Sequence, residues 1–349
     1  MRLAIDVLGG DHAPDVVLNG GLDAMDLLDP SDEIVWVGPQ EVIRDFLDER
    51  GVRDARISIE HATQNIEMHE QPAKAVRQKA DSTIVRMARL GSTKTPPERR
   101  ADAVMSAGNT GACVSAAIMQ MKRLPRVQRP GIAVTIPTFN GPVVLIDAGS
   151  NPEPRPTHLW QYGIMADTYA RHVLGLRNPR IAQMNIGTEE EKGTDLIKQA
   201  RDLLKATPGL NYIGYVEGRD VADGVTDVIV TDGFVGNTLL KMAEGLVKTV
   251  VSAIAHEILN HDPELALRLE PVVKRLYSKI DYHEHGGAPL LGVNGGFIIA
   301  HGSSNRRSIK SAIRMSREFV RSGVNAAIVE RLEQVEREMG VVADAEECE

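Results

Sequence analysis

A cluster of glycine, amide and hydroxyl residues stands where a short apolar run meets a helical pattern, in Ser106–Gly111. The run 103–105 is typical of a buried strand, and 112–122 has the spacing of an amphipathic helix. The two glycines allow a tight turn and a close approach to a ligand, and Asn109 or Thr110 can cap the helix. Because unpaired N–H groups at a helix start bind anions, the segment is either a phosphate site or an ordinary capped turn.

Similar polar clusters follow other short apolar runs. They are 9–14, 147–151, 187–192, 217–220 and 231–237. Short Val- and Ile-rich runs alternate with longer helical patterns, which predicts an α/β fold with a mostly parallel sheet covered on both faces. Ligands of such sheets bind beyond the carboxyl ends of the strands, so we expect these clusters to converge on one rim.

The strands that would place the clusters are expected at 3–7, 34–37, 56–59, 103–105, 132–136, 143–146, 181–185, 212–216, 228–230 and 297–300. Helices are expected at 14–28, 39–50, 71–90, 112–122, 156–174, 194–206 and 306–321. The strands 132–136 and 143–146 form a hairpin through the turn at Asn140-Gly141-Pro142.

Residues 238–281 interrupt this alternation with two consecutive helices, 238–259 and 264–279, separated by a segment that ends in Pro263. This helical hairpin has more apolar residues than one core-facing stripe requires. Its surplus would pack on the body or on a dimer mate, or contact a bilayer surface as a peripheral attachment.

Composition indicates a soluble globular protein, because 42% of the 349 residues are hydrophobic and 25% are charged. We expect a single α/β/α catalytic domain over 1–329, followed by an acidic helix end and tail over 330–349. The net charge is −8, and most of it lies in that tail, which argues against nucleic-acid binding. No apolar run approaches the ~20 residues of a membrane-spanning helix, and a cytoplasmic location is expected.

Several familiar catalytic signatures are absent, among them a phosphate-binding Walker A loop, a dinucleotide fingerprint, a zinc-protease helix and a serine nucleophile elbow. A nucleotide-dependent kinase or a serine hydrolase is therefore not expected. His283 and His285 have no matching cluster of ligands, so we expect no metal. What remains is a rim of glycines, amides, hydroxyls and cations suited to holding an oxyanion.

Six blocks together resemble the bacterial acyl-ACP:phosphate acyltransferase (PlsX) family. They are Gly9–Pro14, Ser106–Gly111, Gly187–Gly193, Thr231–Asn237, Gly286–Gly292 and Ala300–Ser304, in the family's order and over nearly the whole chain. The resemblance implies a three-layer α/β/α fold related to phosphate acetyltransferases and to isocitrate/isopropylmalate dehydrogenases, and a homodimer. The family supplies acyl phosphate to a downstream glycerol-3-phosphate acyltransferase in phosphatidic acid synthesis.

The implied reaction is attack of inorganic phosphate on the thioester of a long-chain acyl group carried on acyl carrier protein. It releases acyl phosphate and free carrier thiol. Phosphate needs no strong base and a thiol of pKa about 8.5 is an adequate leaving group, so no cofactor is expected. The protein must position two anionic partners and stabilise the oxyanion that forms.

The family's motifs map site roles onto this chain. Lys192 would hold the phosphate or the developing oxyanion, and Asn237 would donate to the reacting centre. Backbone and side-chain donors to phosphate would come from Gly108, Asn109, Thr110 and Gly111. Second candidates are Asp11, His12, Asp232, His301, Ser303 and Ser304.

Structural roles compete with these assignments. Lys192 could be an exposed lysine near a helix start, Asn237 could be a helix N-cap, and His12 and His301 could only hold loops together.

Acyl carrier protein is acidic in this family, so a basic face should receive it. One candidate is the face formed by Lys310, Arg314, Arg317 and Arg321, whose spacing places them together on a helix. A second cluster is Arg77, Lys79, Arg86 and Arg89. Two rival functions remain: a phosphate acetyltransferase acting on a small acyl-CoA, and a non-catalytic scaffold that brings carrier protein to the membrane.

Overall fold

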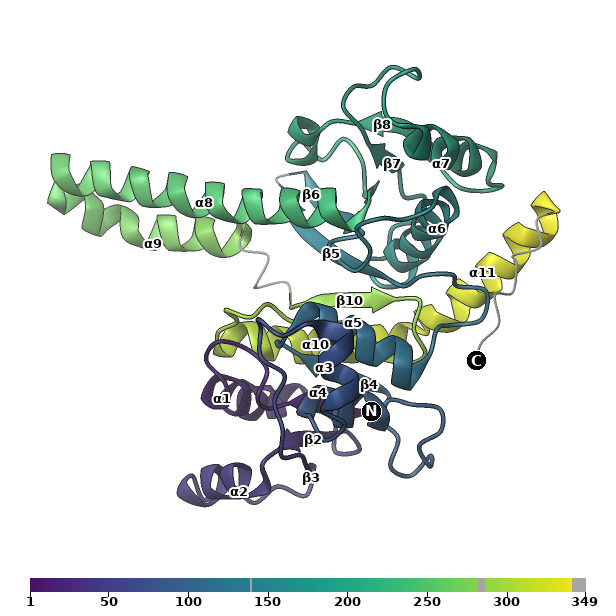
Figure 1. Cartoon of the computed structure of the whole chain (residues 1–349). Helices are drawn as coiled ribbons and strands as arrows, with labels where there is room; N and C mark the ends of the chain where they lie inside the picture. The colour runs from purple at the N-terminus through teal and green to yellow at the C-terminus, as the bar shows by residue number, and fades with distance from the viewer. Residues whose placement is uncertain (139, 281–285, 341–349) are drawn as a thin grey trace.

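The computed structural model describes residues 1–138, 140–280 and 286–340. Figure 1 shows two lobes, with a helical hairpin projecting from the side. One lobe holds the N-terminal strands and the other holds β6 to β8, and β10 and β5 run between them. None of the helices in the described residues combines the length and apolar character needed to cross a bilayer.

The strands form one sheet of 11 strands in the order β3-β2-β1-β4-β11-β10-β5-β6-β9-β7-β8. Their bounds are β1 Arg2–Asp6, β2 Glu33–Gly38, β3 Ile57–His61, β4 Ala103–Ser106, β5 Gly131–Thr138, β6 Gly141–Ile146, β7 Ile181–Met184, β8 Tyr212–Val216, β9 Val228–Val230, β10 Ala288–Leu291 and β11 Gly296–Ile299. The expected α/β fold with a mostly parallel sheet is confirmed, and so is the hairpin of β5 and β6.

The helices lie on both faces of the sheet, apart from the projecting pair α8 and α9. Their bounds are α1 Asp15–Asp23, α2 Gln40–Glu49, α3 Pro72–Gln78, α4 Thr83–Leu90, α5 Thr110–Ala116, α6 Pro156–His172, α7 Asp195–Ala206, α8 Gly233–His261, α9 Pro263–Ile280, α10 Arg306–Ser322 and α11 Val324–Met339. A 3₁₀ turn extends α1 over Ala24–Leu27, and a π turn extends α5 over Ala117–Met121.

Three elements differ from the sequence expectation. The helix expected at 71–90 is two helices, because Ser82 caps the start of α4 with its hydroxyl. The short strand β10 was not anticipated, and the helix end expected from residue 330 belongs to a separate helix, α11, that begins at Val324. β10 contains a proline, which a sequence pattern disfavours in a central strand, but its Pro289 pairs with Ile298 of β11 in an antiparallel ladder.

The expectation that all the polar clusters share one rim is wrong. β10 pairs antiparallel with both β11 and β5, and β5 pairs antiparallel with β6. The strands β6, β9, β7 and β8 therefore run opposite to β1, β4 and β11. The carboxyl ends of the two halves therefore do not share one edge of the sheet, and the segments after β1, β4, β6, β9 and β11 line a cleft.

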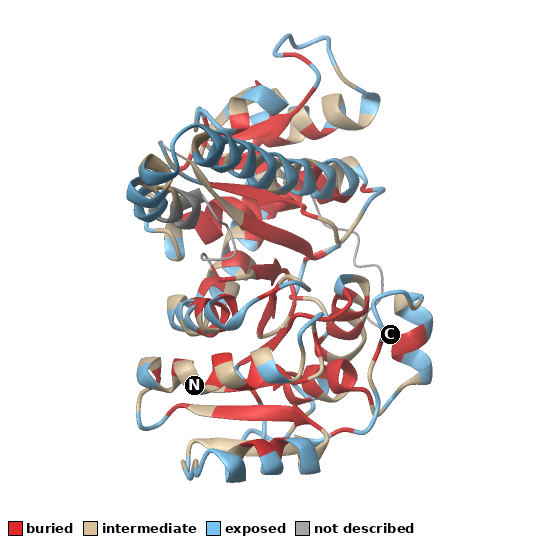
Figure 2. Cartoon of the chain, turned by 90° about the vertical axis from the view of Figure 1, so that its left-hand side faces the viewer, coloured by how far each residue is buried: buried red, intermediate tan, exposed pale blue. Residues whose placement is uncertain are grey.

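The core lies on both sides of this sheet. Figure 2 shows the strands and the central helices buried, while α8 and α9 are largely exposed. One side is packed by α1, α6, α10 and α11 and includes Trp36, Trp160 and Phe319. The other side is packed by α3, α4 and α5 and includes Met87 and Phe297. These layers fix the positions of the strand ends that border the cleft.

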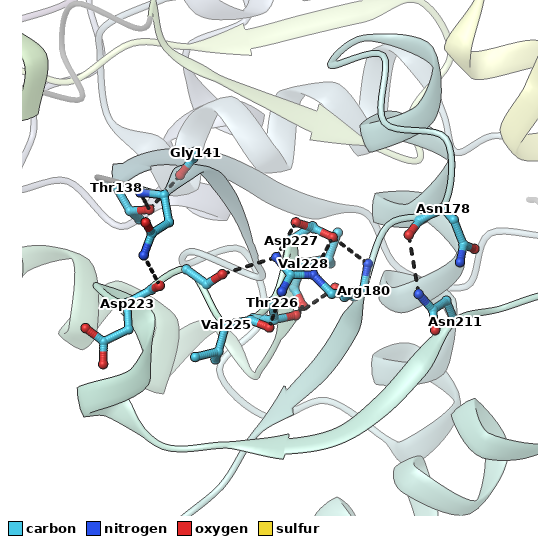
Figure 3. A network of polar contacts seen from close by, with 12 residues as sticks. Thr138, Gly141, Asn178, Arg180, Asn211, Asp223, Val225, Thr226, Asp227 and Val228 are labelled. Carbon is cyan, nitrogen blue, oxygen red and sulfur yellow. Dashed lines mark hydrogen bonds and ion pairs between the residues drawn. The ribbon is translucent and has the colours of Figure 1, made fainter.

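A polar network fixes the entry to β9 (Figure 3). Arg180 makes a two-pronged contact with Asp227, with distances of 3.1 Å from Nε and 2.9 Å from Nη2. The same guanidinium donates to the carbonyl oxygens of Val225 and Gly224. Asn140 donates to the carbonyl of Asp223 at 2.7 Å. The start of β9 is thereby anchored, and its end leads directly to α8.

Candidate active site

One wall of the cleft is built on the buried carboxylate of Asp6, at the end of β1. It accepts a hydrogen bond from the Ser106 hydroxyl at 2.7 Å and one from the backbone N–H of Leu8 at 3.0 Å. Burial raises the pKa of Asp6, although the hydrogen bonds from Ser106 and Leu8 act in the opposite direction. A Cβ on Gly9 would lie 2.8 Å from this carboxylate, so only glycine fits there. The loops after β1 and β4 are thus locked together.

The opposite wall is built on Asp147, at the end of β6. Its carboxylate accepts backbone N–H bonds from Ile132, Gly149, Ser150 and Asn151, at 2.7–3.1 Å. Burial raises the pKa of Asp147, and these hydrogen bonds oppose that rise because they favour the charged form. One carboxylate therefore shapes the whole turn 147–151, which borders α8.

The first turn of α8 lies directly on this turn. Asp232 is the N-cap of α8, and its side chain accepts from the N–H of Val235 at 2.8 Å. Asn237 is inside the helix, exposed, beside Gly149, and the alternative that it caps the helix is therefore wrong. The amide of Asn237 is left to face the cleft.

The cleft between the two walls has a volume of about 350 Å³. Its polar lining comes from Asp11, Thr110, Thr135, Asn237, Lys241, Glu244, His301, Ser304 and Ser308. Its apolar lining comes from Met68, Ile132, Val134, Ala148, Leu240, Ala288, Ile299 and Ala300. An anion could be held at the polar side while an acyl group or its thioester arm lies against the apolar side.

Five of the residues expected from the sequence line this cleft: Asp11, Thr110, Asn237, His301 and Ser304. They come from the segments that follow β1, β4, β9 and β11, and Thr110 and Asn237 lie in the first turns of α5 and α8. The remaining expected residues, Lys192, Gly108, Asn109, Gly111, His12, Asp232 and Ser303, are not among its described lining. The clusters 187–192 and 217–220 contribute no described lining residue either.

Asn109 is buried and its side chain is committed to structure. Its Oδ1 caps α5 by accepting from Ala112 N–H at 3.0 Å, which confirms the capping expectation. Its Nδ2 donates to the carbonyls of Glu67, Met68 and Glu70 at 3.1–3.2 Å. The side-chain donor role expected of Asn109 is therefore not available in this arrangement. The neighbouring N–H groups of Thr110 and Gly111, in the first turn of α5, have no acceptor within the helix.

Lys192 lies in the exposed turn after β7. Its backbone carbonyl accepts from the Asn185 amide at 3.2 Å, and its ammonium has no ion pair with a described residue. β7 is adjacent to β9, with Gln183 opposite Val230, so the turn of Lys192 and the start of α8 leave neighbouring strands.

Among the charged lining residues, sequence reasoning missed Lys241 and Glu244, which follow Asn237 by four and seven positions on α8. That spacing places all three on one helix face. The signal was present, because a helix was expected from 238 onward. Its face could not be assigned without knowing which side of α8 borders the cleft.

Most cations of the basic face expected on α10 form ion pairs with acidic side chains of the same chain. Lys310 pairs with Asp26, Arg317 with Asp29 and Asp32, and Arg321 with Asp29. Arg314 donates to the Ser311 hydroxyl. Acidic residues of 26–32 therefore pair with three of the four cations that were expected to dock a partner, which weakens the case for docking on this face.

Other reactive groups are placed unfavourably for catalysis. Burial raises the pKa of the Cys113 thiol to about 12, so it is no nucleophile. No group of three or more His, Cys, Asp or Glu side chains in the described residues could hold a metal ion, and His283 and His285 lie outside those residues. A hollow of about 650 Å³ between α2 and β3 contains none of the expected site residues.

Comparison with known proteins gives a family match over most of the chain. The model of the family described as "Fatty acid synthesis protein" matches residues 1–327. The phosphate acyltransferase of Desulfitobacterium hafniense (strain DSM 10664 / DCB-2) is 42% identical over 350 residues, covering 99% of this chain and 100% of the relative. The phosphate acyltransferase of Bacillus licheniformis is 42% identical over 337 residues, covering 96% and 99%.

Solved structures share the fold at low sequence identity. A phosphotransacetylase from Streptococcus pyogenes superimposes with a TM-score of 0.57 at 17% identity, covering 95% of this chain and 94% of that one. A phosphotransacetylase from Staphylococcus aureus gives a TM-score of 0.55 at 14% identity, covering 93% and 94%. At these identities the likeness concerns the fold alone.

Proposed function

The chain belongs to the fatty acid synthesis protein family, whose relatives named above are phosphate acyltransferases, and from this premise we propose that the cleft is its active site. The protein is a phosphate acyltransferase that converts long-chain acyl-[acyl carrier protein] and inorganic phosphate into acyl phosphate and free carrier protein. The observation that carries the site assignment is the meeting of a polar side, with Asn237 and Lys241, and an apolar side in one cleft.

Each side of the cleft has a task in this reaction. Phosphate oxygen attacks the thioester carbonyl carbon, the carbon–sulfur bond breaks, and the thiolate leaves with the carrier protein. The rigid walls around Asp6 and Asp147 hold phosphate and the thioester in preorganised positions. Hydrogen-bond donors that face the cleft stabilise the negative charge that develops on the thioester oxygen. The apolar lining, including Leu240 and Ile299, excludes water and accepts the acyl chain next to the thioester.

Asn237 is our candidate for the donor to the thioester oxygen, because it lies in the cleft on a helix start that is fixed against Asp147. Lys192 is our candidate for a cation that approaches the same centre from the turn after β7. Two observations support this role: the Lys192 ammonium has no ion pair with a described residue, and β7 is adjacent to β9. Thr110 and Gly111 supply N–H donors from the first turn of α5 on the facing wall.

Carrier-protein docking is proposed on α3 and α4, not on α10. Of the second basic cluster, Lys79 pairs with Glu70, and Arg86 pairs with Glu60 and Asp81. Arg77 and Arg89 are exposed and have no ion pair with a described residue.

The start of α3 lies against α5, because a Cβ on Gly111 would lie 2.5 Å from Pro72. An acidic partner attracted there would stand beside the wall that carries Thr110.

We propose two contacts for the hairpin of α8 and α9, one with a second copy of the chain and one with a membrane surface. Met242, Leu246 and Val250 form an exposed stripe on α8 roughly half a turn around the helix from Asn237, Lys241 and Glu244. We assign this stripe to the contact with a second copy of the chain. Ile254, Leu259 and Leu267, nearer the tip, are also exposed, and we assign them to peripheral contact with a membrane surface.

The test is phosphate-dependent release of free thiol from long-chain acyl carrier protein, run beside acetyl-CoA. Asn237→Ala should lower kcat about 100-fold or more, as loss of an oxyanion donor does. Lys192→Ala should also lower turnover, and Lys198→Ala on α7 serves as a matched lysine control. Release from acetyl-CoA alone, or full activity of Asn237→Ala, would contradict the assignment.

A further inference from the structure

Met68 lines the cleft with more than half of its side chain exposed. It belongs to the loop between β3 and α3, and its exposed fraction is 54%. The other apolar lining residues, such as Ile132 and Ile299, are buried or half-buried. Met68 therefore continues the apolar lining outward, from the buried strand ends to the mouth of the cleft.

The turn 67–70, which carries Met68, is closed by its own hydrogen bonds. The N–H of Glu70 donates to the carbonyl of Glu67 at 3.2 Å, and the Glu70 carboxylate accepts from the Glu67 N–H at 2.7 Å. The Lys79 ammonium donates to the same carboxylate oxygen at 2.6 Å. Met68 thus projects from a folded turn whose position is fixed.

The buried amide of Asn109 fastens this turn to the wall of the cleft. Its Nδ2 lies 3.1–3.2 Å from the carbonyl oxygens of Glu67, Met68 and Glu70, and its two N–H groups are shared among them. Its Oδ1 caps α5, whose first residue, Thr110, lines the cleft. One side chain therefore fixes the position of Met68 relative to Thr110.

The far end of the Met68 side chain lies against the loop after β11. A Cβ on Gly302 would lie 3.3 Å from Cε of Met68, so the methyl group packs close to that backbone. The carbonyl of Gly302 is itself held by the N–H of Asp11 at 2.8 Å. Met68 is therefore supported at both ends, by the turn that carries it and by this loop.

An exposed thioether held at this place favours an apolar ligand. Methionine is unbranched and polarizable, and it adapts to irregular apolar shapes. The pantetheine arm of the carrier has amide and hydroxyl groups that need hydrogen-bond partners, whereas a thioether is only a weak acceptor. A hydrocarbon chain needs no such partner and gains free energy from the apolar surface that it covers. Met68 therefore matches the acyl chain better than the arm.

The route from the thioester to Met68 crosses the cleft. Asn237, the proposed donor to the thioester oxygen, is on the opposite wall beside Gly149. Between the two walls lie the apolar residues of β5 and β11, among them Val134 and Ile299. A short acyl group would end among these strand residues, and only a longer chain would reach Met68.

We propose that Met68 covers the acyl chain at the mouth of the cleft and sets the preference for long chains. Asn109 is the positioning residue that holds Met68 there. The inference rests on the proposed function, and it deepens that function by naming a residue that determines chain-length preference.

The experiment compares carrier substrates with acyl chains of sixteen and four carbons in the thiol-release assay. Met68→Ala should lower kcat/KM about 5-fold to 10-fold for the long chain and about twofold or less for the short one, because only the long chain loses apolar contact. Met68→Leu should keep the wild-type ratio. Val42→Ala, at an exposed apolar position on α2 outside the cleft, is the control and should change neither value. An equal loss for both chain lengths would overturn the inference.

Asn109→Ser tests the positioning role. Serine keeps an oxygen that can cap α5 but removes the amide donor to the turn 67–70. The variant should lose the preference for long chains as Met68→Ala does, and the double variant should lose no more of it than Met68→Ala alone. Additive losses in the double variant would show that Asn109 does not act through Met68.

Binding of a free fatty acid separates failure of this inference from failure of the proposed function. Octanoate should raise the thermal unfolding temperature of the wild type more than that of Met68→Ala, whereas butyrate should affect both proteins equally. This pattern in a protein that releases no thiol would support the role of Met68 and contradict the proposed function. Equal protection of the two proteins by octanoate would overturn the inference, even in a protein that is an active acyltransferase.

Discussion

A Cβ atom on Gly236 would lie 2.0 Å from the carbonyl oxygen of Asp147, so α8 begins in backbone contact with the turn after β6. This contact places Asn237 and, one turn later, Lys241 at the cleft. The helix cannot keep that position with any larger residue at 236. The site therefore depends on Gly236, although this residue takes no part in the proposed reaction.

Gly236→Ala should displace the start of α8. We expect a loss of about 1–3 kcal/mol of stability from overpacking and a fall in thiol release that exceeds the loss of folded protein. Thermal unfolding and the turnover assay measure the two effects. Gly245→Ala in the same helix is the control, because its Cβ meets nothing within 4 Å, and it should gain up to about 1 kcal/mol from helix propensity. Identical behaviour of the two variants would contradict the contact.

The sequence predicted most elements of this fold because strand and helix signals were local. The alternation of short Val- and Ile-rich runs with amphipathic helices needs no long-range information. β10 was missed because its proline argues against a central strand, and the antiparallel centre of the sheet was missed with it. One unrecognised strand thus changed the expected rim into a cleft between two walls.

The site was predictable where motif residues follow a strand and border the cleft, as for Thr110, Asn237 and Ser304. It was not predictable where side chains are used for structure. Asn109 has the residue type of a phosphate donor, but a loop 40 residues earlier in the sequence occupies its amide. The α10 cations have the spacing of a docking face, but the acidic run that neutralises them is almost 300 residues away.

Asp32 ties α10 to the N-terminus of the chain. Its Oδ1 accepts from the N-terminal ammonium at 2.6 Å, and its Oδ2 lies 3.3 Å from Arg317. Burial raises the pKa of Asp32, but the N-terminal ammonium, the Asp29 N–H and Arg317 outweigh it, and the net pKa is lowered. Asp32 therefore stabilises the fold above its ordinary pKa of 3.8, and this contribution disappears as the pH falls through the lowered value.

Asp32→Asn should lower the free energy of unfolding at pH 7 by about 1–3 kcal/mol. The difference between wild type and variant should shrink as the pH is lowered below about 4, since the wild-type carboxyl is then protonated. Urea unfolding at pH 7, 4 and 3 measures this difference. A gap that stays constant or widens toward pH 3 would mean that the ion pairs of Asp32 do not stabilise the fold.

Charge reversal on two helices should separate docking from folding. Arg77→Glu on α3 should raise KM for acyl carrier protein about 5-fold or more and leave stability unchanged, because Arg77 has no ion pair with a described residue. Arg321→Glu on α10 should lower stability by about 1 kcal/mol, because it loses the pair with Asp29, and leave that KM unchanged. Steady-state kinetics with thermal unfolding distinguish the two. The opposite pattern would return the docking face to α10.

Charged substitutions along the hairpin should separate self-association from membrane contact. Leu246 is 57% exposed in the α8 stripe, and Leu267 is 71% exposed on α9. Burying a leucine contributes about 1.5–3 kcal/mol, so a glutamate at either position should weaken its own contact at least tenfold. Leu246→Glu should convert the proposed dimer to a monomer in sedimentation velocity while vesicle binding persists. Leu267→Glu should reduce binding to anionic vesicles without altering sedimentation.

Each of these variants is the control for the other, since both add one negative charge to an exposed apolar position of the same hairpin. A general effect of charge would change sedimentation and vesicle binding together in both proteins. If Leu246→Glu sediments like the wild type, the stripe of Met242, Leu246 and Val250 is not the dimer contact. If only Leu246→Glu loses vesicle binding, the lipid-facing surface is that stripe, on the side of α8 opposite the residues that line the cleft.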